Sequence, residues 1–158
     1  APQVIGFFSA AEPAIKVIRS IGIPWLANKY MIGITFAVTQ TLRNFLQTTG
    51  LSMTVGAVTP NPHISDLPIA QEYRAAMDAA ELPYDNFSFE SYIGTRIFAD
   101  AAEHITMPIT REKIRKRIES YDAYHYKGLN LTFDPETRSL SPGIWIETNK
   151  NEQWTKQK

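Results

Sequence analysis

At 158 residues the chain has the size of one domain, enough to bury about 70% of the surface that its unfolded form exposes. It carries 16 Lys and Arg against 16 Asp and Glu, and this zero net charge argues against a nucleic-acid or anionic-membrane partner. The absence of cysteine excludes disulfides, thiol catalysis and thiolate metal sites. No apolar run approaches the roughly 18 residues of a membrane span.

The stretch 3–30 is typical of a strand–helix–strand unit. The apolar run 4–8 predicts a strand buried on both faces, and the helical spacing after it predicts a helix that ends at Gly22. A second apolar run begins at Pro24 and predicts the next strand. Ligands in open α/β sheets bind beyond the carboxyl ends of the strands. The candidate binding turns are therefore residues 9–11 and residues 28–30.

The next elements extend this unit. Residues 31–35 form a predicted glycine-containing loop, and Thr35 is a predicted N-cap for a helix at 36–48 that ends at Gly50. A third buried strand is predicted at 51–58. Two βα units that end in a strand predict an α/β fold, a parallel sheet with helices on its faces.

The second part of the chain has a different composition. Pro60, Asn61 and Pro62 lie in an extended connector, since each proline disfavours the α region for the residue before it. Three helices are predicted beyond it: one capped near Ser65 or Asp66 that reaches residue 82, one at 89–105 capped by Ser88, and one at 111–121 capped by Thr110. Strands are predicted at 129–133 and 143–148. We therefore expect an α/β segment formed by 1–60 and 140–158, and a helix-rich segment at 61–139, with crossings near 59–63 and 133–143.

Few residues indicate chemistry. Ser9 and Glu12 fit a capping box, or Glu12 alone caps a helix that begins at Pro13; ordinary capping and a ligand-facing role both remain open. The three histidines have no metal-ligand neighbour or serine partner, and nucleotide-phosphate motifs are absent. We expect no catalytic site, metal or cofactor.

The turn 28–30 has the composition of a ligand-binding group. Asn28, Lys29 and Tyr30 combine an amide, a cation and an aromatic ring, a combination that orients a small polar ligand in a cleft. A plain polar surface loop is the alternative interpretation.

In the order of these elements the sequence resembles the type I periplasmic solute-binding proteins, and within them the branched-chain amino acid (Leu/Ile/Val) receptor family of ABC importers. The resemblance is carried by VIGFFSAAEPAIKVIRSIGIPWLAN, MTVGAVTPNP, SFESYIGTRIFADAAEHI with its early tyrosine Tyr92, TREKIRKRIESY and YKGLNLTFDPETRSLSPGIWIETNKNEQW. It covers nearly the whole chain, but only the C-terminal part of such a receptor. The resemblance places the start of the receptor before Ala1, and with it an incomplete two-lobe architecture.

This resemblance implies a function. Such receptors hold an amino acid or similar small solute between two lobes, close by a hinge, here at Pro60, Asn61 and Pro62, and deliver the solute to an ABC permease outside the cytoplasm, commonly in the periplasm. The implied ligand-binding positions are Phe8, Ser9 and Ala10 at the first strand end, and Asn28, Lys29 and Tyr30 at the second. Amino-acid-binding members generally carry an acidic residue on the second turn. Lys29 departs from that pattern and favours an anionic or carboxylate solute.

Two alternatives belong to other classes. A ligand-binding ectodomain of a sensory receptor has the same fold, and a small α/β enzyme would need Asn28, Lys29 or Glu12 to be catalytic. We also expect the isolated chain to self-associate, since part of its apolar surface lacks the elements that would cover it.

Overall fold

The computed structural model describes residues 2–37, 39–140, 143–149 and 155–156. The chain divides into two compact units, which we describe separately. The sheet unit comprises Ala1–Ile64 and Ile144–Lys158, and the helical unit comprises Ser65–Gly143. The sequence placed the corresponding boundaries near residues 60 and 140, a few residues earlier at each crossing. Among the described residues no helix is long and apolar enough to cross a membrane.

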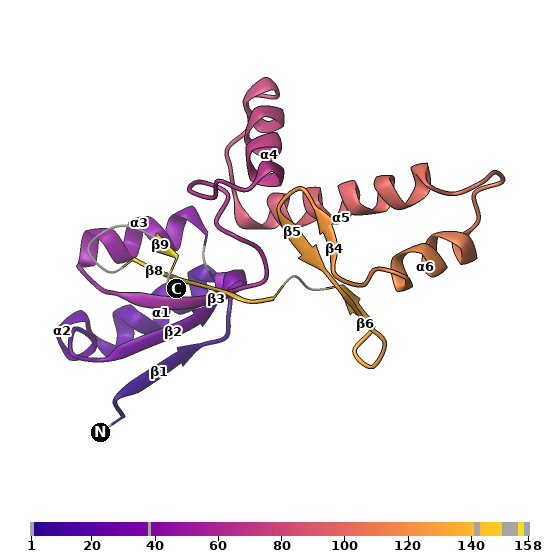
Figure 1. Ribbon diagram of the computed structural model, residues 1–158. Coiled ribbons are helices and arrows are strands. Elements are labelled where there is room, and N and C mark those ends of the chain that lie inside the picture. Colours follow the sequence, from indigo (N-terminus) through magenta and orange to yellow (C-terminus); the bar gives the residue numbers. More distant parts are fainter. Residues whose placement is uncertain (1, 38, 141–142, 150–154, 157–158) are drawn as a thin grey trace. The chain divides into compact units, whose positions relative to one another are not determined.

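The described residues of the sheet unit form a five-stranded mixed sheet in the order β1-β2-β3-β8-β9 (Figure 1). Strands β1, β2 and β3 are parallel to one another, whereas β8 and β9 are antiparallel to their neighbours. Each of the first two crossovers moves one strand in the same direction, so right-handed connections place their helices on the same face of the sheet. The elements are β1 (Val4–Phe7), α1 (Ala11–Ile21), α2 (Ile23–Leu26), β2 (Tyr30–Ile34), the 3₁₀ turn η1 (Thr35–Ala37), α3 (Gln40–Thr49), β3 (Met53–Ala57), β8 (Trp145–Thr148) and β9 (Thr155–Lys156).

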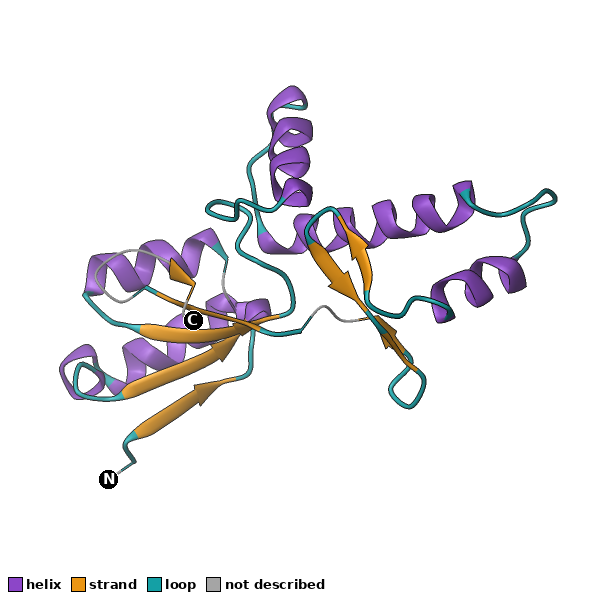
Figure 2. Cartoon of the chain, in the orientation of Figure 1, coloured by secondary structure: helices purple, strands orange, loops and turns teal. Residues whose placement is uncertain are grey.

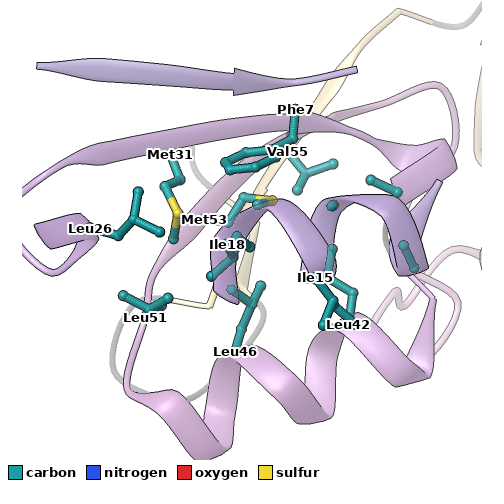
Figure 3. Close-up of a cluster of buried hydrophobic side chains, with 13 residues drawn as sticks. Phe7, Ile15, Ile18, Leu26, Met31, Leu42, Leu46, Leu51, Met53 and Val55 are labelled. Atoms are coloured by element: carbon teal, nitrogen blue, oxygen red, sulfur yellow. The ribbon is translucent and has the colours of Figure 1, made fainter. Parts of the chain in front are cut away.

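The core of the sheet unit lies between the sheet and helices α1 and α3 (Figure 3). In β2 the side chains alternate, with Met31 buried and Ile32 exposed. The strand β1 is likewise buried only towards its Phe7 end. The prediction that the first strand is buried on both faces is therefore wrong. The described helices α1 and α3 cover one face. Fully buried side chains come from α1, α2, α3 and β3: Ile18, Leu26, Leu42, Leu46, Met53 and Val55.

The second strand lies later in the chain than the sequence predicted. The apolar run that begins at Pro24 forms the short helix α2, because proline fits the first helical turn, where no N–H is needed. The expected loop at residues 31–35 is instead most of β2. Its Gly33 serves packing, since a Cβ there would lie 3.1 Å from the Met53 sulfur. This glycine admits a side chain from the neighbouring strand and does not mark a loop.

The ends of α3 are partly as predicted. Thr35 lies in η1, and the N-cap is Thr39, whose hydroxyl accepts a hydrogen bond from the Leu42 N–H at 3.5 Å. Gly50 ends the helix in the left-handed region with φ +66°, as the sequence predicted. The third strand is confirmed as β3.

The described residues of the helical unit form three helices and two short hairpins (Figure 2). Thr110 caps its third helix as predicted, accepting from the Lys113 N–H at 3.3 Å. Asp85, and not Ser88, caps the second helix, because its carboxylate accepts from the N–H groups of Phe87 and Ser88 at 2.8 and 2.9 Å. The elements are α4 (Pro68–Ala79), α5 (Asn86–Glu103), α6 (Arg111–Glu119), β4 (Tyr124–Tyr126) paired with β5 (Leu129–Leu131), and β6 (Phe133–Asp134) paired with β7 (Ser139–Leu140).

Adjacent residues of α1 give a matched test of this core. Ile18 is fully buried and Val17 is 47% exposed. We expect Ile18→Ala to lower the free energy of unfolding of the sheet unit by about 2–5 kcal/mol, and Val17→Ala to lower it by much less. The sequence of the helical unit, 65–143, contains no tryptophan, and Trp25 and Trp145 lie in the sheet unit, so tryptophan fluorescence during urea denaturation reports on the sheet unit. Equal effects of the two substitutions would contradict the assigned core.

Candidate functional site

The parallel strands of the sheet unit end at a common edge. We name this the carboxyl edge and define it by residues 8–10 after β1, 35–37 after β2, and 58–59 after β3. Because β8 is antiparallel and Trp145 pairs with Ala57, Ile144 also lies there. Ligands of open α/β sheets bind beyond such an edge, which makes it the candidate site.

The turn after β1 leads directly into the N-terminus of α1. Ala10 is the N-cap residue, with extended φ and ψ of −68° and 164° and no side-chain capping bond. Both predicted capping schemes, through Ser9 or through Glu12, are therefore wrong. Pro13 is the third residue of α1. Proline is tolerated there because the N–H groups of the first helical turn have no acceptor within the helix, so none is lost. Backbone N–H groups of this first turn lie at the carboxyl edge, where they favour an anion.

The three predicted residues of this turn differ in position. Phe8 is 73% exposed, and its ring folds back over Gly6, where a Cβ would lie only 2.7 Å from the ring. The Ser9 hydroxyl makes a weak 3.3 Å bond to the Ala10 carbonyl. Ser9 and Ala10 therefore lie at the N-terminus of α1, whereas the Phe8 ring lies over the sheet face at Gly6.

The turn after β2 is the part of the carboxyl edge that the sequence missed. The Thr35 hydroxyl donates to the Gly56 carbonyl at 3.1 Å, which joins η1 to the end of β3. The next residue, Phe36, is 56% exposed at this edge. The apolar alternation of residues 30–34 was the signal that could have located this strand end.

Asn28, Lys29 and Tyr30 lie at the opposite edge. Tyr30 begins β2 and pairs with Val4, whereas Phe7, at the carboxyl end of β1, pairs with Gly33. A strand rises about 3.3 Å per residue, so roughly 10 Å separates the two ends. The Lys29 ammonium lies 4.9 Å from the centre of the Trp25 ring, a cation–π distance. The premise that this turn follows a strand is wrong, and with it the argument that Lys29 favours an anionic solute.

A buried ion pair fixes the two passes of the chain that leave and re-enter the sheet unit. Glu147 of β8 is 2% exposed, its Oε2 accepts from the Asn61 amide at 3.0 Å, and it lies 3.7 Å from the Arg43 guanidinium. Burial raises the pKa of Glu147, against the opposing effects of Arg43 and Asn61. Burial also lowers the pKa of Arg43, against the field of Glu147. A second buried amide, Asn149, accepts from the Met53 N–H at 2.7 Å and donates to the Leu51 carbonyl at 2.9 Å.

The expected hinge residues belong to this buried region. Pro60, Asn61 and Pro62 are buried inside the sheet unit, and the Asn61 carbonyl oxygen of the side chain also accepts from the His63 N–H at 2.9 Å. The division between the units falls later, after Ile64, and before Ile144 on the return.

Polar clusters of the helical unit hold its own elements together. Glu72 accepts from the Tyr92 hydroxyl at 2.8 Å and forms ion pairs with Arg96 at 3.0 Å and with Lys127. Burial and this carboxylate raise the pKa of Tyr92 to about 12. His104 contacts the Asp100 carbonyl within its own helix at 2.7 Å. Within the described ranges, no three His, Cys, Asp or Glu residues are grouped as a metal site.

Comparison with solved structures explains this arrangement of elements. A possible leucine/isoleucine/valine-binding protein from Rhodopirellula baltica SH 1 matches 99% of the chain at 27% identity with a TM-score of 0.82, over 43% of its own length. A substrate-binding periplasmic protein from Ralstonia solanacearum matches 98% at 21% identity and a TM-score of 0.79, over 45% of its length. The chain has the fold of the type I periplasmic binding proteins. The resemblance and the α/β class predicted from the sequence are confirmed.

A third match extends this fold to a distant sequence. A leucine-binding protein from Thermotoga maritima MSB8 matches 99% of the chain with a TM-score of 0.74 at only 14% identity, over 44% of its length. The chain thus spans less than half the length of these proteins. Searches of protein-family models and of curated proteins find no match.

The Glu147 carboxyl gives a pH-dependent test of the buried ion pair. Its pKa is higher in the folded than in the unfolded state, so the folded state binds the proton more tightly and stability falls as the pH rises from about 4.5 through the raised value. We expect Glu147→Gln to remove this fall from the pH dependence of tryptophan-detected unfolding. Glu12→Gln, at an exposed position of α1, should leave it in place.

The ion pair itself is tested by removing its cation. At pH 7, Arg43→Met should cost about 3–5 kcal/mol, because the buried Glu147 carboxylate loses the charge that opposes its desolvation. Adding Glu147→Gln should recover part of that loss, since an amide needs no counter-charge. A double variant no more stable than Arg43→Met would contradict the ion pair's role.

Proposed function

We propose that this chain is part of an extracytoplasmic solute-binding protein, and that its carboxyl edge forms one wall of the solute site. The fold match supports a binding protein, and the solved structures of this fold named above are those of binding proteins. The solute is an amino acid or a similar small polar or anionic molecule. In this proposal, the protein delivers it to an ABC permease outside the cytoplasm.

The observation that carries the proposal is the uncapped N-terminus of α1 at the carboxyl edge. Ala10 provides no side-chain acceptor, so the N–H groups of the first turn are available to a carboxylate of the solute. Phe36, exposed at the neighbouring strand end, supplies an aromatic surface for the apolar part of such a molecule. An anionic group on the solute is thus supported by the helix terminus and no longer by Lys29.

Solute capture by this fold involves hinge closure, and we propose hinge points that differ from Pro60, Asn61 and Pro62. The Asn61 side chain donates a buried hydrogen bond to Glu147 and accepts another from the His63 N–H. A residue held in this way does not suit a hinge, which must absorb large changes in φ and ψ. The boundaries after Ile64 and before Ile144 suit a hinge better. Gly143, with φ +111°, is a position there that favours glycine.

A charge-only comparison at Ala10 tests the proposed anion contact. A thermal-shift screen of amino acids and organic acids on the complete natural polypeptide first identifies a stabilising solute. Ala10→Asn and Ala10→Asp both add a helix cap of the same size, but only the aspartate places a negative charge beside the solute carboxylate. By isothermal titration, we expect Ala10→Asp to bind at least about tenfold more weakly than Ala10→Asn, close to 1.4 kcal/mol.

Lys29→Ala distinguishes the two edges of the sheet. It should retain the affinity, because Lys29 lies at the opposite end of β2. Loss of binding in Lys29→Ala, with Ala10→Asp and Ala10→Asn equal, would contradict the proposed wall.

A further inference from the structure

The turn after β2 holds one exposed residue between two buried ones. In η1, Thr35 and Ala37 are buried, whereas Phe36 between them is 56% exposed. Side chains of successive residues in a 3₁₀ turn point about 120° apart, so two of them can enter the interior while the third points outward. The turn is therefore held through Thr35 and Ala37, and it presents the ring of Phe36 at the carboxyl edge.

The Thr35 hydroxyl links this turn to the sheet. It donates to the Gly56 carbonyl at 3.1 Å, and Gly56 is also the partner of Ile34, the last residue of β2. The turn contacts α1 and β3, and Ala37 belongs to the core of the sheet unit. Apolar contacts such as those of Ala37 are not directional, whereas a hydrogen bond is. Because χ1 of threonine is restricted, fixing its hydroxyl also fixes the backbone of the turn.

Loss of this hydroxyl would change the position of the turn. The Gly56 carbonyl would lose a donor in a partly buried position, where a group without a partner is unfavourable. Water or a shifted backbone N–H would then replace the hydroxyl. Either replacement moves η1 relative to β3, and the ring of Phe36 moves with it.

We propose that Thr35 is a positioning residue of the solute wall, and that its bond to Gly56 sets where the Phe36 ring meets the solute. This inference rests on the proposed function, in which Phe36 contacts the apolar part of the solute. Thr35 acts through Phe36 and makes no contact with the solute itself. An apolar surface that is fixed before the solute arrives needs less ordering on binding, which raises the affinity and slows release.

Isothermal titration of the complete natural polypeptide, with a solute that the thermal-shift screen identifies, tests this role. Thr35→Val keeps the branched shape but removes the hydroxyl, and it should weaken binding at least about fivefold. Thr35→Ser keeps the hydroxyl and should bind within about twofold of the wild type. Thr49→Val is the matched control, because the Thr49 hydroxyl donates to the Phe45 carbonyl at 2.8 Å at the far end of α3. It should leave the affinity unchanged.

A double-mutant cycle with Phe36 shows whether Thr35 acts through the ring. In a Phe36→Ala background, Thr35→Val should change the affinity by less than about twofold, because no ring remains to be positioned. An undiminished loss in that background would show that Thr35 contacts the solute directly, and it would overturn the positioning role.

Hydrogen exchange of the same polypeptide gives a readout that needs no solute. Thr35→Val should speed exchange of the Phe36 and Ala37 amides at least about threefold relative to Thr35→Ser, because η1 opens more often. Equal exchange in the two variants would overturn the proposal. Circular dichroism and thermal unfolding check that every variant folds.

The binding outcomes separate this inference from the proposed function. If Phe36→Ala binds the solute as tightly as the wild type does, the ring is not part of the solute wall, and the proposed wall and the positioning role are both overturned at this strand end. If Phe36→Ala binds weakly but Thr35→Val binds normally, the positioning role alone is overturned.

Discussion

The buried contact of Glu147 with Arg43 and Asn61 is the interaction on which the sheet unit depends. The chain leaves this unit after β3 and returns in β8, so two segments 86 residues apart must be fixed side by side. Backbone pairing of β3 with β8 supplies part of this, and the Asn61 amide bonded to Glu147 ties the departing segment to the returning strand. Arg43, from α3, adds the helix layer to the same contact. Another register of β8 would bury the Glu147 carboxylate without Arg43 and Asn61, which is unfavourable. The ion pair therefore favours the observed register, although burying its two charges costs free energy of desolvation.

The contact of Glu147 with Arg43 and Asn61 also helps to position the carboxyl edge. With the crossing segments fixed, the ends of β1, β2 and β3 are held at one side of the unit, and the Thr35 bond to Gly56 holds the second strand end against the third. The N-terminus of α1 lies there, and no side chain caps it. Rigid strands that present a helix terminus suit the preformed wall of a binding site.

The sequence predicted the fold class because that information is local. The apolar run of β1, the spacing of α1, and Gly50 at the end of α3 each follow from propensities within a few residues. The second strand was predicted too early in the chain. The apolar run at Pro24 forms the helix α2, and Gly33 lies in β2, where it makes room for Met53. That single shift moved half of the predicted site to the wrong edge. The bond of Asn61 to Glu147 could not be predicted, because nothing local relates residues so distant in the chain.

Binding of a solute at the carboxyl edge of the sheet is tested most directly by amide chemical-shift mapping on the complete natural polypeptide, titrated with a solute that stabilises it. We expect the largest shifts on the first turn of α1, at Ala11 and Glu12, and on Phe36. The largest shifts at Asn28, Lys29 and Tyr30, with none at the start of α1, would contradict it.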